Sequence, residues 1–173
     1  MRVYFDHSAT TPVDKRVVEA MIPYYLEIFG NASSLHEFGQ EAYDALDKSR
    51  KLIANKMNAK YDELIFTSGG TESDNFAIKG VARVFKVKHG KNHVITTKIE
   101  HPAVLRSVEA LKKEGFSITL LNVDKEGFVD LNQLEKEIND QTILVSIMQA
   151  NNEIGTIQDL ETIGKICKEK DVL

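Results

Sequence analysis

Apolar and polar positions change their spacing at about residue 63, and the rest of the chain alternates between two patterns. Short runs of apolar and β-branched residues, typical of buried strands, are separated by stretches in which apolar positions recur every three or four residues. The runs cover 64–67, 93–97, 118–121 and 142–148, and the helical stretches cover about 71–87, 102–114, 131–138 and 159–170. This alternation predicts right-handed βαβ units around a largely parallel, buried sheet, and therefore an α/β fold.

The part of the chain before residue 63 has helical spacing only. After an irregular start, Asp14 is placed to cap a helix whose apolar positions run from Val17 to Leu26. A second helical pattern covers about 36–57, and the Gly-Asn-Ala-Ser-Ser segment at 30–34 separates the two. The sequence therefore predicts two consecutive helices ahead of the sheet.

Composition narrows the class of protein. The 173 residues include 22 Lys and Arg against 26 Asp and Glu, a net charge of −4, which argues against nucleic-acid binding through phosphate neutralisation. The hydrophobic share of 42% is that of an ordinary globular domain. No signal peptide is evident, and no apolar run approaches the roughly 18 residues of a membrane span. We expect a soluble, cytoplasmic domain.

The single cysteine, Cys167, cannot form an internal disulfide, and no Cys/His cluster indicates a metal site, so we expect no metal. Cys167 lies beside Ile163 and Ile166 in the last helical stretch. This position favours a small buried hydrophobic residue over a nucleophile.

The last helical stretch ends at Asp171-Val172-Leu173, where the alternation predicts a further strand. We therefore expect the chain to be cut within its fold. A sheet that ends on an unpaired apolar edge is prone to aggregation.

In an open parallel sheet, ligands bind beyond the carboxyl ends of the strands, so the loops after the strands are the candidate site. The first loop, 67–73, contains Gly69 and Gly70 and leads into a helix whose first N–H groups favour an anion. Ser68 and Thr71 add hydroxyl donors. Because the segment matches neither GxxxxGK[ST] nor GxGxxG, a single phosphate group fits better than a nucleotide. A glycine turn with Thr71 as the helix cap explains the same residues equally well.

The second loop, 98–102, places His101 before Pro102, and a proline suits the first turn of a helix. An imidazole at this edge of the sheet can stack on an aromatic ligand or shuttle a proton. A helix cap or a surface position is the more common role of a lone histidine, and this loop by itself favours that role.

The third loop, 149–156, brings Gln149, Asn151, Asn152 and Glu153 directly after the longest apolar strand. Carboxamides offer donors and acceptors, as recognition of a hydroxylated heteroaromatic ring requires. A turn held by an asparagine side chain is the alternative, but the density of amides favours binding. Taken together, a phosphate cradle, an imidazole and an amide pair at one edge predict a pocket for a phosphorylated aromatic cofactor.

Four segments in this order and spacing resemble one family: 4–12 (YFDHSATTP), 66–75 (FTSGGTESDN), 100–101 (EH) and 150–155 (ANNEIG). The chain resembles the cysteine desulfurases of the NifS/IscS type, which are fold-type-I pyridoxal 5′-phosphate (PLP) enzymes related to class V aminotransferases. The resemblance runs along the whole chain. It implies that residues 14–173 form the N-terminal half of the PLP-binding large domain, and that residues 1–13 belong to the small domain.

The resemblance implies a role for each candidate residue. Gly70 and Thr71 would bind the cofactor phosphate. His101 would stack on the pyridine ring and assist proton transfer as the catalytic residue, and Asn152 would contact the phenolic oxygen of the ring.

The resemblance also implies an activity and partners. The family reaction converts L-cysteine to L-alanine and leaves a persulfide on an enzyme cysteine. Its sulfur passes to an iron–sulfur scaffold or a tRNA-thiolation protein. The implied assembly is a homodimer in which residues 31–36 serve the neighbouring protomer.

Some features of the family have no counterpart in this sequence. No lysine matches the position to which the family's cofactor is attached, and neither the aspartate that faces the pyridine nitrogen nor the persulfide-forming cysteine is present. Gly70 replaces an alanine of many relatives, Ala32 replaces a proline, and Gln149 stands where some relatives have histidine. We therefore expect the 173-residue chain to be inactive by itself.

Two other functions stay open. The missing lysine is consistent with a non-catalytic PLP-binding or dimerising protein that partners a full-length desulfurase. Without the resemblance, a stand-alone α/β module that binds flavin mononucleotide also explains the predicted phosphate site, and such a ligand would stabilise it by mass action.

Overall fold

The structure is a computed structural model that describes residues 1–173. The chain divides into two compact units, the N-terminal unit (Met1–Phe66) and the sheet unit (Thr67–Leu173). The boundary expected between residues 13 and 14 concerns the domains of a whole enzyme, and it stays a prediction. None of the helices combines the length and apolarity that crossing a membrane requires.

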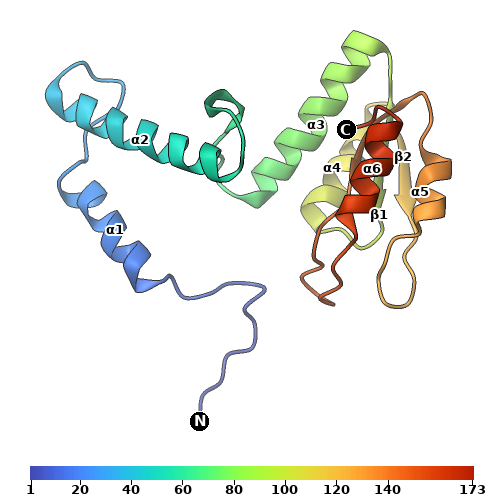
Figure 1. The fold of residues 1–173 in the computed structure, drawn as a ribbon, viewed down its shortest axis with the longest axis horizontal. Helices are drawn as coiled ribbons and strands as arrows, with labels where there is room; N and C mark the ends of the chain where they lie inside the picture. The colour runs from blue at the N-terminus through green and yellow to red at the C-terminus, as the bar shows by residue number, and fades with distance from the viewer. The chain divides into compact units, whose positions relative to one another are not determined.

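The sheet unit contains three parallel strands with helices between them (Figure 1). The strand β1 (His93–Thr97) lies between β2 (Ser117–Leu121) and β3 (Thr142–Ser146), so the strand order is β2-β1-β3. The helices are α3 (Gly70–His89), α4 (Pro102–Lys113), α5 (Leu131–Glu137) and α6 (Leu160–Glu169). The predicted α/β fold and its parallel sheet are confirmed.

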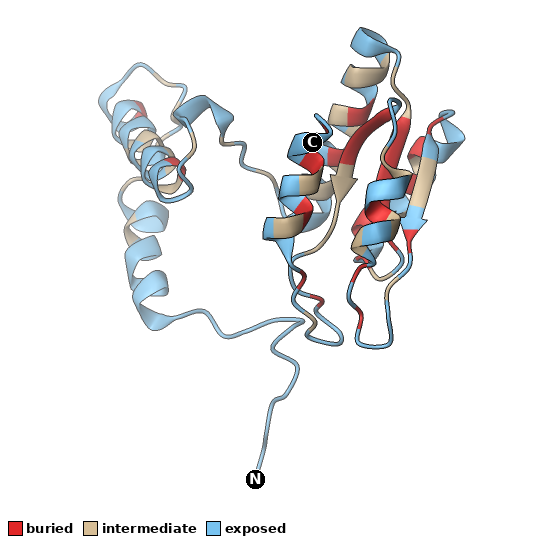
Figure 2. Cartoon of the chain, turned by 45° about the vertical axis from the view of Figure 1, so that its right-hand side comes forward, coloured by how far each residue is buried: buried red, intermediate tan, exposed pale blue.

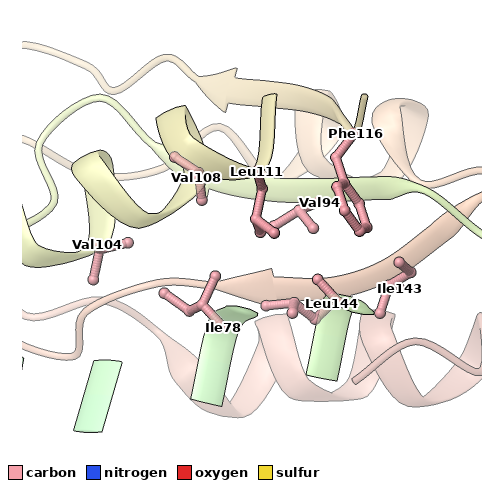
Figure 3. Packing of buried hydrophobic residues seen from close by; sticks show 9 residues of the cluster. Ile78, Val94, Val104, Val108, Leu111, Phe116, Ile143 and Leu144 are labelled. Atoms are coloured by element: carbon pink, nitrogen blue, oxygen red, sulfur yellow. The ribbon is translucent and has the colours of Figure 1, made fainter. Parts of the chain in front are cut away.

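Helices cover both faces of the sheet, as the continuously apolar strands predict. Consecutive residues of β1 point to opposite faces, so Val94 packs with α3 and α4 whereas Ile95 packs with α5 and α6. Figure 3 shows Leu111 of α4 meeting Val94 in the first cluster, and Figure 2 shows continuous burial along the central part of the sheet, where every residue of β1 is buried. Cys167 belongs to the second cluster and is 8% exposed, which confirms its interpretation as a small buried residue.

The strand predicted at 64–67 is wrong. This segment is irregular backbone that follows a short 3-10 turn, η1 (Tyr61–Glu63), and Phe66 is 47% exposed. A strand persists only when a neighbour pairs with its backbone groups, and no strand of the chain pairs with this segment. Instead, the Arg50 guanidinium donates to the Leu64 carbonyl and lies 4.7 Å from the centre of the Phe66 ring.

The last residue of the chain pairs with the outer side of β3. The Leu173 N–H donates to the Ile143 carbonyl at 3.2 Å, and the Leu173 carbonyl accepts from the Val145 N–H at 2.7 Å. Bonds from one residue to two positions that are two apart on the neighbour are the pattern of parallel pairing. Backbone pairing therefore begins where the sequence predicts a further strand.

The N-terminal unit contains the two predicted helices, α1 (Lys15–Leu26) and α2 (Glu37–Lys56), followed by η1. The Asp14 carboxylate caps α1 by accepting from the Arg16 N–H at 2.8 Å, as the sequence predicts. The helix contains Pro23, and the chain leaves it after Leu26.

These two helices bury little. No residue of α1 is buried, and α2 buries only Gly39 and Ala54 (Figure 2). Gly39 is buried because the turn before α2 is tight: a Cβ at this position would lie 2.3 Å from the Ser34 carbonyl oxygen. The unit therefore has a locally defined turn but no apolar core of its own.

Candidate functional site

Three loops of the sheet unit converge at the carboxyl ends of β1 and β3. These strands are parallel neighbours, so the loop after β1 (98–101) and the loop after β3 (147–158) begin side by side. The helix α3 packs on β3 and α4. Arg83 and Lys86, in the later part of α3, bond to Glu114 at the end of α4, so the two helices run in the same direction and both begin at the edge of the sheet where the strands end.

The first turn of α3 presents donors that the protein itself does not use. The N–H groups of Gly70, Thr71 and Glu72 and the Thr71 hydroxyl have no hydrogen-bond partner within the chain. A Cβ on Gly69 or Gly70 would meet no atom within 4 Å, so the space in front of the turn is open to a ligand. The cap position is Gly69, so the alternative interpretation of Thr71 as the helix cap is wrong. Free amides at the start of a 20-residue helix suit an anion such as phosphate.

Glu72 holds the loop that precedes α3. Its Oε2 accepts from both the N–H and the hydroxyl of Ser68, each at 2.6 Å, and these bonds hold the pKa of Glu72 below its usual value. The hydroxyls of Thr67 and Ser73 also lie 2.6 Å apart. The loop is thus fixed by side chains that leave the Gly70 and Thr71 amides available.

His101 is the N-cap of α4, and its side chain is exposed. Its Nδ1 accepts from the Ala103 N–H at 3.1 Å, and Pro102 occupies the first helical position. The capping role that the sequence favours for a lone histidine is therefore confirmed. Because Nδ1 is the acceptor, the neutral ring has its proton on Nε2, which stays free to meet a ligand.

The two adjacent asparagines after β3 have different surroundings. Asn151 is 6% exposed: its Nδ2 donates to the Ile99 carbonyl at 2.8 Å, and its Oδ1 accepts from the N–H groups of Glu153 and Ile154. Asn152 is exposed, and its only side-chain partner is Glu153 at 3.4 Å. The alternative of an asparagine-held turn is confirmed for Asn151, whereas Asn152 keeps its amide available for a ligand.

Glu100 has a structural part in the site that sequence reasoning missed. It is 6% exposed, and its Oε1 accepts from the Thr97 hydroxyl at 3.0 Å and from the Met148 N–H at 2.9 Å. Burial raises the pKa of this carboxyl, which the two hydrogen bonds partly oppose. The sequence offers one signal for it: Glu100 lies in the short loop between the buried strand β1 and the helix cap His101, where little space separates it from the sheet. A charged residue in a loop is usually exposed, so this signal is weak.

The structure therefore brings together the loops of all four predicted site residues: Gly70, Thr71, His101 and Asn152. Each of them has a side chain or an amide that is free toward solvent. Their roles toward a cofactor stay predictions. Cys167 lies apart from these loops, in the cluster under α5 and α6, and burial raises the pKa of its thiol.

The chain matches the family model of class-V aminotransferases over residues 3–173. Two relatives are named cysteine desulfurase IscS. The protein from Neisseria meningitidis (strain FAM18) is 54% identical over 172 residues, which cover 99% of this chain and 42% of that protein. The protein from Dictyoglomus turgidum is 55% identical over 170 residues, which cover 98% of this chain and 43% of that protein. The chain thus spans less than half the length of these relatives.

Solved structures agree with the sequence relatives. One described as a NifS-like protein superposes with a TM-score of 0.93 at 46% identity, covering 99% of this chain and 46% of that one. Another, described as SspA in complex with cysteine, gives a TM-score of 0.90 at 39% identity over 98% of this chain and 48% of that one. The chain therefore belongs to the class-V aminotransferase family, and its relatives in that family are cysteine desulfurases of the NifS and IscS type.

Proposed function

We propose that this chain supplies the phosphate-binding and ring-binding side of the PLP site of a cysteine desulfurase. The observation that supports this most directly is the convergence of three loops whose donors are free: the first amides of α3, the imidazole of His101 and the carboxamide of Asn152. The names of the relatives agree with it.

The donor set fits PLP in its chemistry. Gly70 and Thr71 offer two amides and a hydroxyl at a helix N-terminus, and the absence of any atom near the position of a Gly70 Cβ leaves room for a phosphate to approach. His101 offers a flat ring and Asn152 offers donors for a phenolic oxygen. When bound, PLP supplies an electron sink for a carbanion at the substrate.

The contributions of the protein follow from its own hydrogen bonds. The bond from Ala103 N–H to Nδ1 fixes the His101 ring at the start of α4, so Nε2 is the atom that holds or transfers a proton. The amides of Gly70 and Thr71 orient the phosphate end, and Asn152 orients the opposite end of the ring. Binding at two ends sets the position of the ring without any contact to Cys167.

The substrate and products belong to the same proposal. We propose L-cysteine as substrate, in line with the cysteine complex of the SspA structure. An enzyme thiol then takes the sulfur to form a persulfide, and L-alanine is released. Cys167 does not suit this step, because it is buried and its thiol pKa is raised. A sulfur-accepting protein, a homodimeric assembly and a cytoplasmic location complete the proposal.

The test is binding of pyridoxamine 5′-phosphate, which has the ring, the phenolic oxygen and the phosphate of PLP but cannot attach to lysines. We expect saturable 1:1 binding. Thr71→Val should weaken it about three- to tenfold, the value of one hydrogen bond. Thr162→Val is the matched control, because Thr162 also lies in the first turn of a helix but bonds to Asp159. Tighter binding of flavin mononucleotide would contradict the proposal.

For the 173-residue chain by itself we expect binding without turnover. No lysine of the sequence matches the family position, and its one cysteine is buried. Intact mass after incubation with PLP and reduction with borohydride checks the first point, and an assay for alanine formed from L-cysteine checks the second. A stoichiometric adduct on one lysine together with alanine formation would show a complete active site.

A further inference from the structure

We propose that Glu100 and Asn151 are positioning residues that form a reciprocal brace between the loop after β1 and the loop after β3. The brace fixes His101 and Asn152 relative to each other. The inference rests on the proposed function, since it assigns the brace to the ring end of that site. Neither brace residue contacts the ligand in this proposal.

The two hydrogen bonds of the brace run in opposite directions. The Glu100 side chain, from the first loop, accepts from the Met148 backbone N–H of the second loop at 2.9 Å. The Asn151 side chain, from the second loop, donates to the Ile99 backbone carbonyl of the first loop at 2.8 Å. Each loop therefore contributes one side chain and one backbone group. Because both side chains are only 6% exposed, water does not readily replace either bond, and breaking one leaves a buried group unpaired.

Each brace residue comes directly before a predicted site residue. Glu100 is buried whereas His101 is exposed, and Asn151 is buried whereas Asn152 is exposed. The buried side chain of each pair holds the backbone in place, so the Cα position of the exposed residue that follows is fixed. A shift of either loop would move its site residue together with its brace residue.

Further bonds fix both ends of the brace. The Thr97 hydroxyl donates to the same Oε1 of Glu100 at 3.0 Å. The N–H groups of Glu153 and Ile154 donate to Oδ1 of Asn151 at 2.9 and 3.1 Å. Neither side chain can rotate without losing several bonds, so the brace transmits the position of one loop to the other.

Gln158 provides a matched comparison in the same loop after β3. It is also 6% exposed, its Nε2 donates to the Gly127 carbonyl at 2.7 Å, and its Oε1 accepts from the Val129 N–H at 3.1 Å. This carboxamide joins the loop after β3 to the loop after β2 and makes no hydrogen bond to residues 98–101. A variant of Gln158 therefore breaks a similar buried bond without breaking the brace.

The first experiment measures amide hydrogen exchange of Met148 by NMR in the ligand-free 173-residue chain. Asn151→Asp keeps the oxygen acceptor but removes the donor to the Ile99 carbonyl and to the Met148 sulfur, which lies 3.3 Å from Nδ2. Variants of Glu100 separate the brace from this direct contact, because they leave both Asn151 and Met148 unchanged. In Asn151→Asp, Met148 exchange should rise about tenfold or more although its own acceptor is unchanged, because the second bond of the brace is lost. Gln158→Glu should leave the exchange rate of the Met148 amide within about twofold of the wild-type rate. Unchanged Met148 exchange in Asn151→Asp would overturn the brace.

Glu100 gives the same test from the opposite loop, should Asn151→Asp fail to fold. Glu100→Ala removes the acceptor and should broaden or shift the Asn151 side-chain NH₂ signals. Glu100→Gln keeps an acceptor oxygen and should restore them. Signals that respond equally to both substitutions would contradict a brace that depends on this acceptor.

The second experiment compares the affinity for pyridoxamine 5′-phosphate with the affinity for inorganic phosphate. Inorganic phosphate probes the start of α3 alone, whereas the larger ligand also needs His101 and Asn152. Asn151→Asp and Glu100→Ala should lower the affinity for pyridoxamine 5′-phosphate about tenfold and leave the affinity for inorganic phosphate within about twofold of the wild-type value. Glu100→Gln and Gln158→Glu should bind both ligands as the wild type does. An equal loss for both ligands would show a general loosening and would overturn the proposal.

The two proposals fail in different ways. A wild-type chain that binds phosphate but gains nothing from the ring would overturn the proposed function, and the role of the brace at a ring site with it. If the wild-type chain binds pyridoxamine 5′-phosphate more tightly than inorganic phosphate, and Asn151→Asp and Glu100→Ala keep this difference in affinity, the brace alone is overturned.

Discussion

Two helices of equal length show how different the two units of this protein are. The helices α1 and α4 each have 12 residues and an amphipathic pattern, yet α1 buries none of its residues whereas α4 buries five. The difference lies in what surrounds them. The strands of the sheet unit provide an apolar layer for α4, and nothing in the N-terminal unit provides one for α1. An amphipathic pattern predicts a helix, but packing needs a second layer.

Local interactions are what the N-terminal unit relies on instead. One of its ion pairs joins Arg16 to the capping residue Asp14, and two others, Lys15 with Glu19 and Lys51 with Asp47, are spaced i,i+4 along the helices. Such pairs contribute only about 0.2–0.5 kcal/mol each. The sheet unit, by contrast, has apolar clusters on both faces of its sheet. The comparison predicts that equivalent substitutions have unequal effects in the two units.

The largest effect is expected for a core leucine. Leu111→Ala removes a side chain that is 0% exposed and should cost the sheet unit about 2–5 kcal/mol of unfolding free energy. The equivalent Leu46→Ala in α2, where the leucine is 48% exposed, should cost less than about 1 kcal/mol. Urea unfolding followed by backbone NMR signals of β1 reports on the sheet unit.

The same titration can follow the N-terminal unit separately. All five tyrosines, Tyr4, Tyr24, Tyr25, Tyr43 and Tyr61, lie in that unit and the chain has no tryptophan, so tyrosine fluorescence reports on it alone. An equal loss of unfolding free energy for Leu46→Ala and Leu111→Ala would show that the apolar face of α2 is packed against other residues, and would contradict the difference between the two units.

A smaller effect is expected for helix caps. Asp130 caps α5 by accepting from the N–H groups of Asn132 and Gln133, and α5 places the fully buried Leu134 in the core. Asp130→Ala should therefore cost the sheet unit about 1 kcal/mol. Asp14→Ala removes the cap of α1 and should lower helix content without changing the unfolding of the sheet unit.

Circular dichroism and urea unfolding measure both cap variants. Asp130→Asn is the control, because asparagine caps a helix about as well as aspartate. A sheet unit destabilised as much by Asp14→Ala as by Asp130→Ala would mean that the two units unfold together.

The same contrast explains what the sequence predicts well. Alternating apolar runs and helical stretches predict the three strands and the helices between them, because each element lies in a layer that its own pattern describes. The run 64–67 has equally good strand character but forms no strand, since a strand also depends on a partner elsewhere in the chain. No local pattern contains that information.

The candidate site shows a similar division. The loops around Gly70, His101 and Asn152 are predictable, because parallel strands place their carboxyl ends at one edge. The pattern does not tell which of two adjacent polar residues turns inward. Asn151 and Asn152 are the same residue type, and what distinguishes them is the set of contacts that Asn151 makes, with the Ile99 carbonyl and with the N–H groups of Glu153 and Ile154. Glu100 was missed for the same reason.

A still smaller effect, which depends on pH, is expected at the amino end of the sheet. His93 is 4% exposed, its Nδ1 and Nε2 lie 2.9 Å from the hydroxyls of Thr142 and Thr119, and the Asn139 amide and the Glu137 carboxylate also face this network. Burial lowers the pKa of His93, which Glu137 partly opposes. Because the folded unit favours the neutral ring, stability is greatest above the unfolded pKa of about 6.5 and is lost as pH falls below it.

Urea unfolding at pH values from about 5 to 8 measures this dependence. His93→Gln should remove it, because glutamine can hydrogen-bond but does not titrate. An unchanged pH dependence in His93→Gln would contradict the assignment.

The smallest effect, and one of opposite sign, is expected for Glu100. Burial raises its pKa, so the folded unit favours the protonated carboxyl; this contribution is present below the unfolded pKa and is lost as pH rises through the folded pKa. Glu100→Gln keeps an acceptor for Thr97 and Met148 but removes the charge, so it should gain stability over the wild type as pH rises from about 4 to 7.

Glu114 gives the opposite control in the same unit. Its carboxylate is paired with Arg83 at 2.6 Å, which lowers its pKa, so its contribution is present above the unfolded pKa and is lost as pH falls. Glu114→Gln should therefore lose stability at neutral pH and approach the wild type in acid. Urea unfolding of both variants across this range decides the matter. If the unfolding free energy of Glu100→Gln changes with pH as that of Glu114→Gln does, the hydrogen bonds of the Glu100 carboxylate stabilise its charged form more than burial destabilises it.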